Sequence, residues 1–404
     1  MKIAIIGGGA SGMVAAYLLD RKGYQVTVLE KEPILGGHIR TLNKNVVPNQ
    51  NHCDRILEAG VLEFPVKFRN FIALMKELEI ELKPVALGSG LFLEDGRHFL
   101  SAGAIAKNFQ GIQKLIEYLR IDTLYARSAL LWLKNHFAKI DNFHDRPLSY
   151  YLRSQCIRNC WIKLLVMYSY SMQYPLIDAF PAELAIPVLN NYTFVDWLRI
   201  EGGVYSYIEK ILDRFNGQIL VNAEVTNIAR KFDGVEIKLL NGETEKFDKI
   251  IFATPPDRVI KILFDPTDEE IRWFSPWQEN SATTIVHTDT SLYSRYGIEE
   301  FSEFDFFQGK NGWGYNAYLN QICGIAAPPK YSLAFNLDCE IDPEQIVHIQ
   351  KHDTPLYTVP SFHYRNEIVQ ANGKNNTYHT GAYLADGLHE GAITSAIRVA
   401  QLIK

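Results

Sequence analysis

Cysteine is scarce in this chain of 404 residues, and the five cysteines that it has are scattered. They are Cys53, Cys156, Cys160, Cys323 and Cys339. An odd number without regular spacing argues against a disulfide framework and fits a reducing compartment. Cys156 and Cys160 lie four residues apart, but no second Cys or His pair at zinc spacing accompanies them. We therefore expect core thiols and no bound metal.

Basic clusters and long apolar runs are also missing. The net charge is −5 and no Lys/Arg run occurs, which excludes the basic surface that nucleic-acid binding needs. No stretch of about 18 uninterrupted apolar residues is present, so no transmembrane helix is expected. The apolar residues after Lys2 are broken by glycines and followed by Asp20, which favours a buried strand and a glycine turn over a signal peptide. We expect a soluble, cytoplasmic protein.

The composition that remains is ordinary for a globular protein, with 47% hydrophobic and 12% aromatic residues. It excludes the disordered and fibrous classes. The length allows two or three domains, and neither an internal repeat nor a low-complexity linker marks a boundary. The domain organisation must therefore be inferred from motifs.

The first thirty residues carry the pattern of a dinucleotide-binding unit. An apolar strand is predicted over Lys2 to Ile6, and the glycines at Gly7, Gly9 and Gly12 follow it in the spacing G-x-G-x-x-G. Gly7 permits the tight turn, Gly9 lets the backbone approach a pyrophosphate, and Gly12 allows close packing of helix on strand. The helix predicted next, from Met13 to Lys22, presents its N-terminus to the phosphates.

A second strand is predicted over Gln25 to Leu29, and Glu30 stands at its end. Glu30 comes eighteen residues after Gly12 and is placed to accept hydrogen bonds from a ribose hydroxyl pair. An acid at this position disfavours a 2′-phosphate, so the dinucleotide is expected to be FAD or NAD rather than NADP.

A second glycine doublet helps to choose between these two cofactors. Gly36-Gly37-His38-Ile39-Arg40-Thr41 comes shortly after Glu30. It resembles the doublet that approaches FAD in flavoproteins of the amine oxidase and phytoene desaturase superfamily. The form Gly-Gly-His is most similar to NAD/FAD-binding proteins associated with cyclopropane-fatty-acid genes. Glu58-Ala59-Gly60 stands where that group usually has Asp-Thr-Gly.

The C-terminal segment extends the resemblance. A strand over Thr377 to Thr380 is followed by Gly381-Ala382-Tyr383, by Gly387-Leu388-His389-Glu390-Gly391 and by a helix from Ala392 to Ile403. The superfamily group usually reads Gly-Ala-Trp, a spacer and Gly-Phe-His-Glu-Asp-Gly here, so Tyr383 replaces the Trp and the Asp is missing. The resemblance implies that this segment runs beside the ribityl chain and directs a helix N-terminus at the flavin.

Two internal segments complete the expected cofactor site. Ile219 to Ile228 is predicted as one strand that brings a backbone edge to the adenine, and Lys249 to Pro256 as a buried strand that runs into a turn near the cofactor. The motifs and the resemblance together imply non-covalent FAD held by Gly7, Gly9, Ala10, Ser11, Gly12, Glu30, Lys31, Gly36, Gly37, His38, Arg40, Val225, Thr254, Gly381, Ala382, Tyr383, His389, Glu390 and Ala392.

The predicted fold is α/β, a Rossmann-like FAD-binding domain interleaved with a substrate domain of mixed sheet and helical cap. Because the cofactor segments lie at both ends and in the middle, the FAD-binding domain is expected to comprise residues 1–85, 200–268 and 355–404. The substrate domain takes residues 86–199 and 269–354. A helix is expected over Ile112 to Leu133, and strands over Thr283 to His287, Gly314 to Asn320 and Tyr331 to Leu337.

The substrate domain is rich in aromatic residues, some of which we expect to line an apolar cavity above the flavin. The candidates are Tyr168, Tyr170, Tyr174, Trp313, Tyr315 and Tyr318. The candidate catalytic residues are His389, Lys310 and Tyr318. His389 matches the flavin-proximal motif, and Lys310 is similar to the lysine that many amine oxidases hold near flavin N5. Packing, capping and strand-end hydrogen bonds are the alternative roles for all of them.

The resemblance favours a FAD-dependent oxidoreductase that dehydrogenates or desaturates a largely apolar small molecule by hydride transfer to flavin N5. Three alternatives stay open. They are a redox-neutral double-bond isomerase of a fatty-acid-like substrate, an amine or amino-acid oxidase, and a non-catalytic FAD-binding partner protein. Substrate, electron acceptor and oligomeric state are not predicted.

Overall fold

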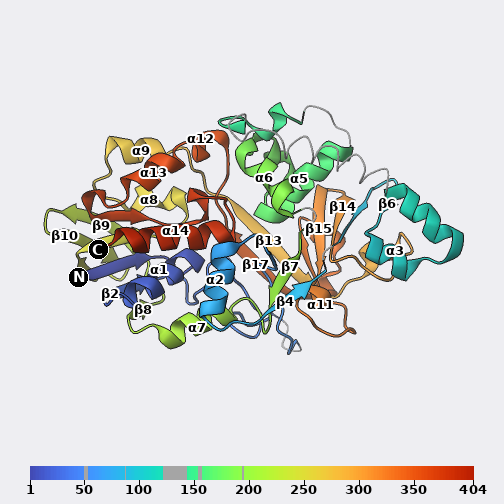
Figure 1. The fold of residues 1–404 in the computed structure, drawn as a ribbon, viewed down its shortest axis with the longest axis horizontal. Coiled ribbons are helices and arrows are strands. Elements are labelled where there is room, and N and C mark those ends of the chain that lie inside the picture. Colours follow the sequence, from blue (N-terminus) through green and yellow to red (C-terminus); the bar gives the residue numbers. More distant parts are fainter. Residues whose placement is uncertain (50–52, 87, 122–142, 153–156, 193–194) are drawn as a thin grey trace.

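The structure is a computed structural model, and it describes residues 1–49, 53–86, 88–121, 143–152, 157–192 and 195–404. Its strands form four sheets. In Figure 1 the parallel sheet and both termini lie on the left and the largest sheet lies right of the centre. Within the described residues, none of the helices has the length and apolar character needed to cross a bilayer.

A five-stranded parallel sheet forms the first layer, in the order β18-β12-β1-β2-β8. The strands are β1 (Lys2–Ile6), β2 (Gln25–Leu29), β8 (Gln218–Leu220), β12 (Lys249–Phe252) and β18 (Thr377–His379). Apolar residues make up most of β1, β2 and β12 and are buried, as expected for a parallel sheet covered on both faces. This sheet confirms the predicted Rossmann-like unit.

Two helices from opposite ends of the chain pack together on this sheet. Helix α1 (Ala10–Asp20) follows the glycine turn, and α14 (His389–Leu402) is the last helix, so the first and last segments lie side by side (Figure 1). Gly23, at a φ of +83°, lies in the turn between α1 and β2. The buried side of α14 includes Ile393, Ala396 and Val399, at helical spacing.

The other sheets have antiparallel pairing almost throughout. A three-stranded meander contains β9 (Val225–Lys231), β10 (Gly234–Leu239) and β11 (Thr244–Phe247), and a small sheet contains β3 (Phe64–Pro65), β4 (Leu82–Val85) and β7 (Trp197–Ile200). The seven-stranded sheet has the order β17-β13-β16-β15-β14-β5-β6, with one parallel pair between β14 and β5. Its strands are β5 (Ser89–Phe92), β6 (His98–Phe99), β13 (Ser281–His287), β14 (Phe304–Gly309), β15 (Gly312–Tyr318), β16 (Ser332–Phe335) and β17 (Ile346–Asp353).

The remaining helices surround these sheets. They are α2 (Arg69–Glu77), α3 (Ala102–Asn108), α5 (Ile157–Tyr170), α6 (Ala182–Tyr192), α7 (Ser206–Arg214), α8 (Pro256–Ile262), α9 (Asp268–Phe274), α10 (Ser291–Ser294), α11 (Leu319–Ile322), α12 (Val359–Phe362) and α13 (Arg365–Ala371). Helices α5 and α6 lie over one face of the seven-stranded sheet (Figure 1). The helix expected over Ile112 to Leu133 is present at 111–121, and its remainder is outside the described residues.

Most predicted strands are confirmed, but one prediction is wrong. The single strand expected over Ile219 to Ile228 is two strands in different sheets, β8 and β9. Asn222 between them takes a left-handed backbone conformation with φ +53°. The backbone N–H of Ala223 donates to the carbonyl of Glu30 at 2.8 Å, so the chain turns toward β2 instead of continuing as a strand.

All strands of the parallel sheet fall in the segments predicted to bind FAD, and all strands of the seven-stranded sheet fall in the segments predicted for the substrate domain. The division at residues 85, 199, 268 and 354 itself stays a prediction.

Candidate functional site

The first glycine turn fits the roles predicted for its residues. Gly7 has a φ of +108°, and a Cβ there would lie 2.6 Å from the carbonyl oxygen of Ala253. A Cβ on Gly12 would lie 2.0 Å from the carbonyl oxygen of Gly7. Gly9 differs, because its Cβ would meet Gly37 Cα at an ordinary 3.6 Å. Packing therefore requires glycine at positions 7 and 12, whereas at position 9 the missing side chain leaves room for a ligand.

The N-terminus of α1 has no side-chain cap, a feature that suits the binding of an anion. The helix begins with Ala10 and Ser11, Gly9 precedes it without a side chain, and its first turn contains no acidic residue. The N–H of Met13 makes the first intrahelical hydrogen bond, to the carbonyl of Gly9 at 2.9 Å. The N–H groups before it have no acceptor within the helix, and together with the helix dipole they favour a phosphate.

Glu30 lies directly against this turn. Its Oε2 accepts a hydrogen bond from the N–H of Gly8 at 2.6 Å, and its Oε1 accepts one from the N–H of Glu32 at 2.9 Å. The side chain is buried. Lys31, the next residue, instead points to the surface and pairs with Asp353 at 3.2 Å.

The second glycine doublet joins the first. Gly36 forms an isolated β-bridge with Gly9, and its N–H donates to the carbonyl of Gly8 at 2.8 Å. Gly36 and Gly37 have φ values of +112° and +59°, which favour glycine. His38 follows, with its Nε2 2.7 Å from the carbonyl oxygen of Asp353. The structure thus brings the two glycine motifs, about thirty positions apart in the sequence, together. We call residues 7–12 and 36–37 the glycine cradle.

Arg40 supplies a buried cation beside this cradle. Its guanidinium donates to backbone, at 3.2 Å to the carbonyl of Ile39 and 3.4 Å to that of Leu35. Burial lowers its pKa, and the nearby charge of Glu30 opposes that shift. Among the described residues no ion pair joins Arg40 to a carboxylate. A buried cation without a paired anion fits a diphosphate.

Two buried hydroxyl groups near the end of β12 and in the C-terminal segment have no hydrogen-bond partner among the described residues. They belong to Thr254 and Tyr383. Gly381 donates its N–H to Ser395 Oγ at 2.9 Å, and a short 3₁₀ turn, Ala382–Leu384, follows it. A buried hydroxyl without a partner costs free energy, so both atoms are suited to a polar ligand.

His389 is the first residue of α14, and aromatic side chains surround its ring. Its Nε2 lies 2.8 Å from the hydroxyl of Tyr207, and its ring packs against Phe64 and Phe71 at centroid distances of 5.2 and 5.6 Å. Burial lowers the pKa of His389 to about 3, so the ring is neutral at neutral pH.

The neighbouring residues of α14 have structural contacts. Glu390 accepts hydrogen bonds from the N–H groups of Asn70 and Phe71, both at 2.9 Å, and so caps α2. Ala392 is buried within α14. Asp386 accepts hydrogen bonds from the N–H groups of Leu388 and Gly391 at 2.9 Å. Asp386, which sequence reasoning missed, thus accepts hydrogen bonds at the start of α14.

Two further candidates occupy other places. Val225 begins β9 and is buried, beyond the turn in which Ala223 contacts Glu30. Lys310 is exposed in the turn between β14 and β15, where its N–H donates to Glu340 at 3.3 Å. The structure thus groups Lys310 with Glu340 rather than with the glycine cradle.

The predicted aromatic group is divided between two hydrophobic cores, with Tyr318 at one and the other five residues at the larger one. Tyr168 and Tyr315 lie together, with ring centroids 5.0 Å apart, and Tyr174 lies near Trp313 at 6.3 Å. Tyr170 packs against Phe180 and Tyr357 instead. Tyr318 packs against Phe301 at 5.3 Å, in a second core cluster.

Glu58 is a buried link that sequence reasoning identified only as a departure from the family pattern. Its Oε2 accepts a hydrogen bond from Thr41 Oγ1 at 2.8 Å, and its Oε1 accepts one from the N–H of Val204 at 2.7 Å. Burial raises the pKa of Glu58 to about 8, and the two hydrogen bonds oppose the shift. Glu58 also lines a cavity of about 300 Å³ together with Leu62, Arg199, Gly203 and Cys323, among others.

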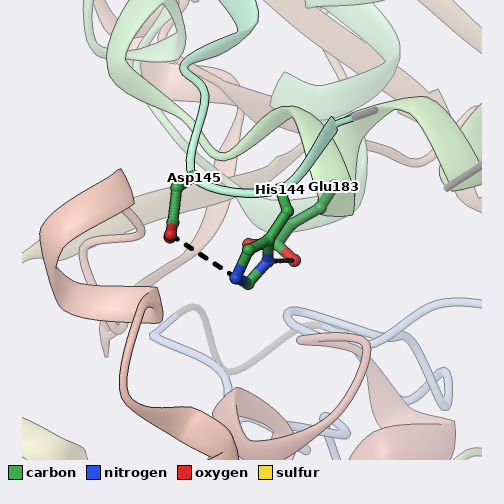
Figure 2. Close-up of side chains that lie close together, drawn as sticks. All are labelled: His144, Asp145 and Glu183. Carbon is green, nitrogen blue, oxygen red and sulfur yellow. Dashed lines mark hydrogen bonds and ion pairs between the residues drawn. The ribbon is translucent and has the colours of Figure 1, made fainter. Parts of the chain in front are cut away.

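A separate polar cluster joins α6 to the segment before η2 (Leu148–Tyr150) and to α13 (Figure 2). His144 Nδ1 lies 3.1 Å from Glu183 and its Nε2 lies 3.4 Å from Asp145, so its two nitrogens meet different carboxylates. Arg365 already pairs with Glu183 at 2.6 Å, and His363 with Asp145 at 2.7 Å. These pairings favour an ion-pair network over a metal site.

Fold and cradle together define an α/β dinucleotide-binding protein. The family model of flavin-containing amine oxidoreductases matches residues 10–293, which is more than half of the chain. The chain therefore belongs to the flavin-containing amine oxidoreductase family.

Individual proteins are similar to it at low identity. An L-amino acid dehydrogenase of Synechocystis is 28% identical over 291 residues, which cover 66% of this chain and 59% of that protein. The flavin-dependent L-tryptophan oxidase RebO of Lentzea aerocolonigenes is 22% identical, over 63% of this chain and 58% of that protein. The chain thus matches less than two thirds of the length of either relative.

A solved structure shows the same fold. The CLA-producing fatty acid isomerase from P. acnes aligns with a TM-score of 0.71 and 15% identity, and the alignment covers 100% of this chain and 98% of that protein. At this identity the likeness is one of fold.

Proposed function

We propose that this protein is a FAD-dependent oxidoreductase that dehydrogenates or desaturates a small, largely apolar molecule. The observation that carries the proposal is the cradle, in which two glycine turns meet a capless helix N-terminus and the buried Arg40. The hydroxyls of Thr254 and Tyr383, unpartnered among the described residues, supply further groups for a polar ligand. These donors and this cation suit a diphosphate and a flavin.

The role of each residue follows from its position. Gly9, Ala10 and Ser11 would hold the diphosphate with Arg40, while Glu30 would exchange its contact with Gly8 for the ribose hydroxyls. His389, neutral and fixed by Tyr207, would orient the start of α14. Bound FAD supplies the hydride acceptor, so the protein needs no acid or base of its own to accept electrons.

We further propose that the FAD is held without a covalent bond. Attachment through cysteine needs a thiol at the flavin segment. Cys339 is exposed and lies 3.2 Å from Asn311, and Cys323 is half-buried and lines the cavity that also contains Glu58. The segment from Gly381 to Gly391 contains no cysteine.

A redox-neutral double-bond isomerase is the second candidate function. The fold likeness to the fatty acid isomerase and the aromatic pair Tyr168–Tyr315 favour it. A lipid-like substrate would also fit the resemblance to proteins associated with cyclopropane-fatty-acid genes. The L-amino acid dehydrogenase relative supports amino-acid oxidation as a further alternative.

An anaerobic assay of the FAD-loaded protein separates these functions. Substrate that bleaches the flavin without oxygen supports dehydrogenation, and peroxide release in air from an amine or amino acid supports an oxidase. Product that forms without oxygen consumption or net flavin reduction supports the isomerase. Bound FAD that no substrate and no photoreduction can cycle would favour a non-catalytic partner protein and contradict the proposal.

A further inference from the structure

Glu63 is a buried carboxyl group with one satisfied oxygen and one free oxygen. Its Oε1 accepts a hydrogen bond from the hydroxyl of Tyr168 on α5. Its Oε2 is buried and has no hydrogen-bond partner among the described residues. Glu63 immediately precedes β3, and the next residue, Phe64, packs against the ring of His389. Glu63 thus lies between the start of α14, where His389 is, and Tyr168 of α5, which packs on the seven-stranded sheet.

The surroundings of Glu63 are aromatic. Tyr168 is stacked on Phe304 with ring centroids 4.4 Å apart, and it meets Tyr315 edge to face at 5.0 Å. The carboxylate of Glu63 lies close enough to Tyr315 and to the Cys323 thiol to raise the pKa of both groups, in each case after burial as the larger cause. No cation is among the groups that shift the pKa of Glu63.

A cavity reaches residues next to Glu63. Leu62, the preceding residue, and Cys323 both line the cavity of about 300 Å³ that also contains Glu58. The charges of Glu58 and Glu63 both raise the pKa of the Cys323 thiol, after burial as the largest cause, so both carboxyl groups lie near it. Two arginines line this cavity, and both are paired: Arg199 with Glu201 at 2.8 Å and Arg55 with Asp54 at 3.5 Å.

A buried carboxyl oxygen without a donor is costly, and folded proteins seldom leave one unmatched. We propose that Glu63 Oε2 accepts a hydrogen bond from an amine or hydroxyl donor of the substrate and thereby selects substrates that carry one. The inference rests on the proposed FAD-dependent function and defines one polar feature of its otherwise apolar substrate.

The same oxygen disfavours a carboxylate at this point of the substrate. Two carboxylates in a water-poor aromatic setting repel each other strongly. A substrate that places its own carboxylate beside Glu63, whether an amino acid or a fatty acid, would therefore bind poorly in that orientation. Burial raises the pKa of Glu63 to about 7, while the hydrogen bond from Tyr168 opposes the shift, so the group is a ready proton acceptor near neutral pH.

The test uses the FAD-loaded protein and four probes of matched size: benzylamine, benzyl alcohol, toluene and benzoate. Their binding is measured by calorimetry and by the change in the flavin absorption spectrum, at a pH above the Glu63 pKa of about 7. In Glu63→Gln the amide oxygen can keep the hydrogen bond from Tyr168, which places the amide NH2, a donor, where Oε2 stood. We therefore expect the affinity for the two donor probes to fall about 10- to 100-fold, as for a lost hydrogen bond to a charged group. Toluene binding should not change, and benzoate binding should improve.

Glu303→Gln is the matched control. Glu303 is also a buried carboxylate at the substrate sheet, but its Oε2 accepts a hydrogen bond from the N–H of Gly88 at 2.6 Å. Its replacement should leave the affinities for all four probes unchanged.

Wild-type protein provides a second measurement in case Glu63→Gln does not fold. Benzyl alcohol carries no charge, so its affinity should rise as the pH passes the Glu63 pKa of about 7, while toluene affinity stays constant. If no donor probe binds the wild-type flavoprotein more tightly than toluene does, or if Glu63→Gln leaves the affinities unchanged, the inference is wrong. Failure of the protein to bind FAD would instead overturn the proposed function.

Discussion

Glu58 Oε2 accepts a hydrogen bond from Thr41 Oγ1 at 2.8 Å, and this contact joins the second glycine doublet to the segment before β3. The other oxygen of Glu58 holds the N–H of Val204, which precedes α7. One buried side chain thereby connects its own segment to Thr41, 17 residues before it, and to Val204, 146 residues after it. The cradle depends on this connection because Gly36 and Gly37 reach Gly9 through the chain that Thr41 anchors.

Removing the acceptor should loosen the cradle. Glu58→Ala leaves the Thr41 hydroxyl and the Val204 N–H buried without their acceptor, so we expect a loss of about 2–4 kcal/mol in the free energy of unfolding and weaker FAD retention. Glu58→Gln keeps an acceptor oxygen and should lose far less. Chemical denaturation of both variants checks this. Equal stability of the Ala and Gln variants would show that the two hydrogen bonds do not hold the segment.

Gly9 and Gly12 of the first glycine turn should respond differently to replacement by alanine. Gly9→Ala adds a Cβ at an ordinary distance from Gly37 and at an allowed φ of −76°, so the variant should fold normally but bind FAD at least about tenfold more weakly. Gly12→Ala pushes a Cβ against the carbonyl of Gly7 and should impair folding. Thermal melts and FAD titration separate the two effects. Normal FAD affinity in Gly9→Ala would mean that the diphosphate does not approach this residue.

Arg40 should contribute to the affinity for FAD and not to the stability of the FAD-free protein. Its guanidinium is buried against backbone carbonyls, so Arg40→Met removes a desolvated charge and should leave the FAD-free protein as stable as the wild type, or more so. The affinity for FAD should fall about 10- to 100-fold, because a charged contact to phosphate is lost. Denaturation without FAD measures the stability, and titration with FAD measures the affinity. Loss of stability with unchanged FAD affinity would assign Arg40 a structural role instead.

Stability should depend on pH through Glu63. Its pKa is raised from 4.5 to about 7 in the folded protein, so folded Glu63 keeps a proton that the unfolded chain releases. The stabilisation from this group is fully present below pH 4.5 and is lost as the pH rises through about 7. Glu63→Gln should therefore be more stable than the wild type by about 1–3 kcal/mol above that range, and the difference should shrink toward acid pH. A difference that does not vary with pH would show that Glu63 titrates normally.

Local patterns in the sequence predicted the glycine turn, the strands around it and the place of Glu30 directly after the second strand. They could do so because each depends on residues within one strand–helix–strand unit, where Gly7 and Gly12 meet backbone directly. The C-terminal helix was predictable for the same reason, since its apolar spacing is local.

Other features depend on contacts between segments far apart in the sequence and could not be predicted from local patterns. Glu390 caps α2 across 320 residues, and Glu58 reaches Val204 across 146. The strand predicted over Ile219 to Ile228 failed because the chain turns at Asn222 to hydrogen-bond with β2 and the residues after it. The catalytic role of Lys310 was inferred from resemblance alone. The sequence around Lys310 does not reveal that it lies in an exposed turn beside Glu340.

Reconstitution with FAD is the most direct test of the central claim, that the two glycine turns and Arg40 form a non-covalent flavin site. The purified protein, incubated with FAD and passed over a desalting column, should keep a flavin spectrum in equimolar amount and release all of the FAD on denaturation. Gly9→Ala treated in the same way should emerge folded and colourless. Folded wild-type protein that retains no flavin, or Gly9→Ala that retains as much as the wild type, would contradict the claim.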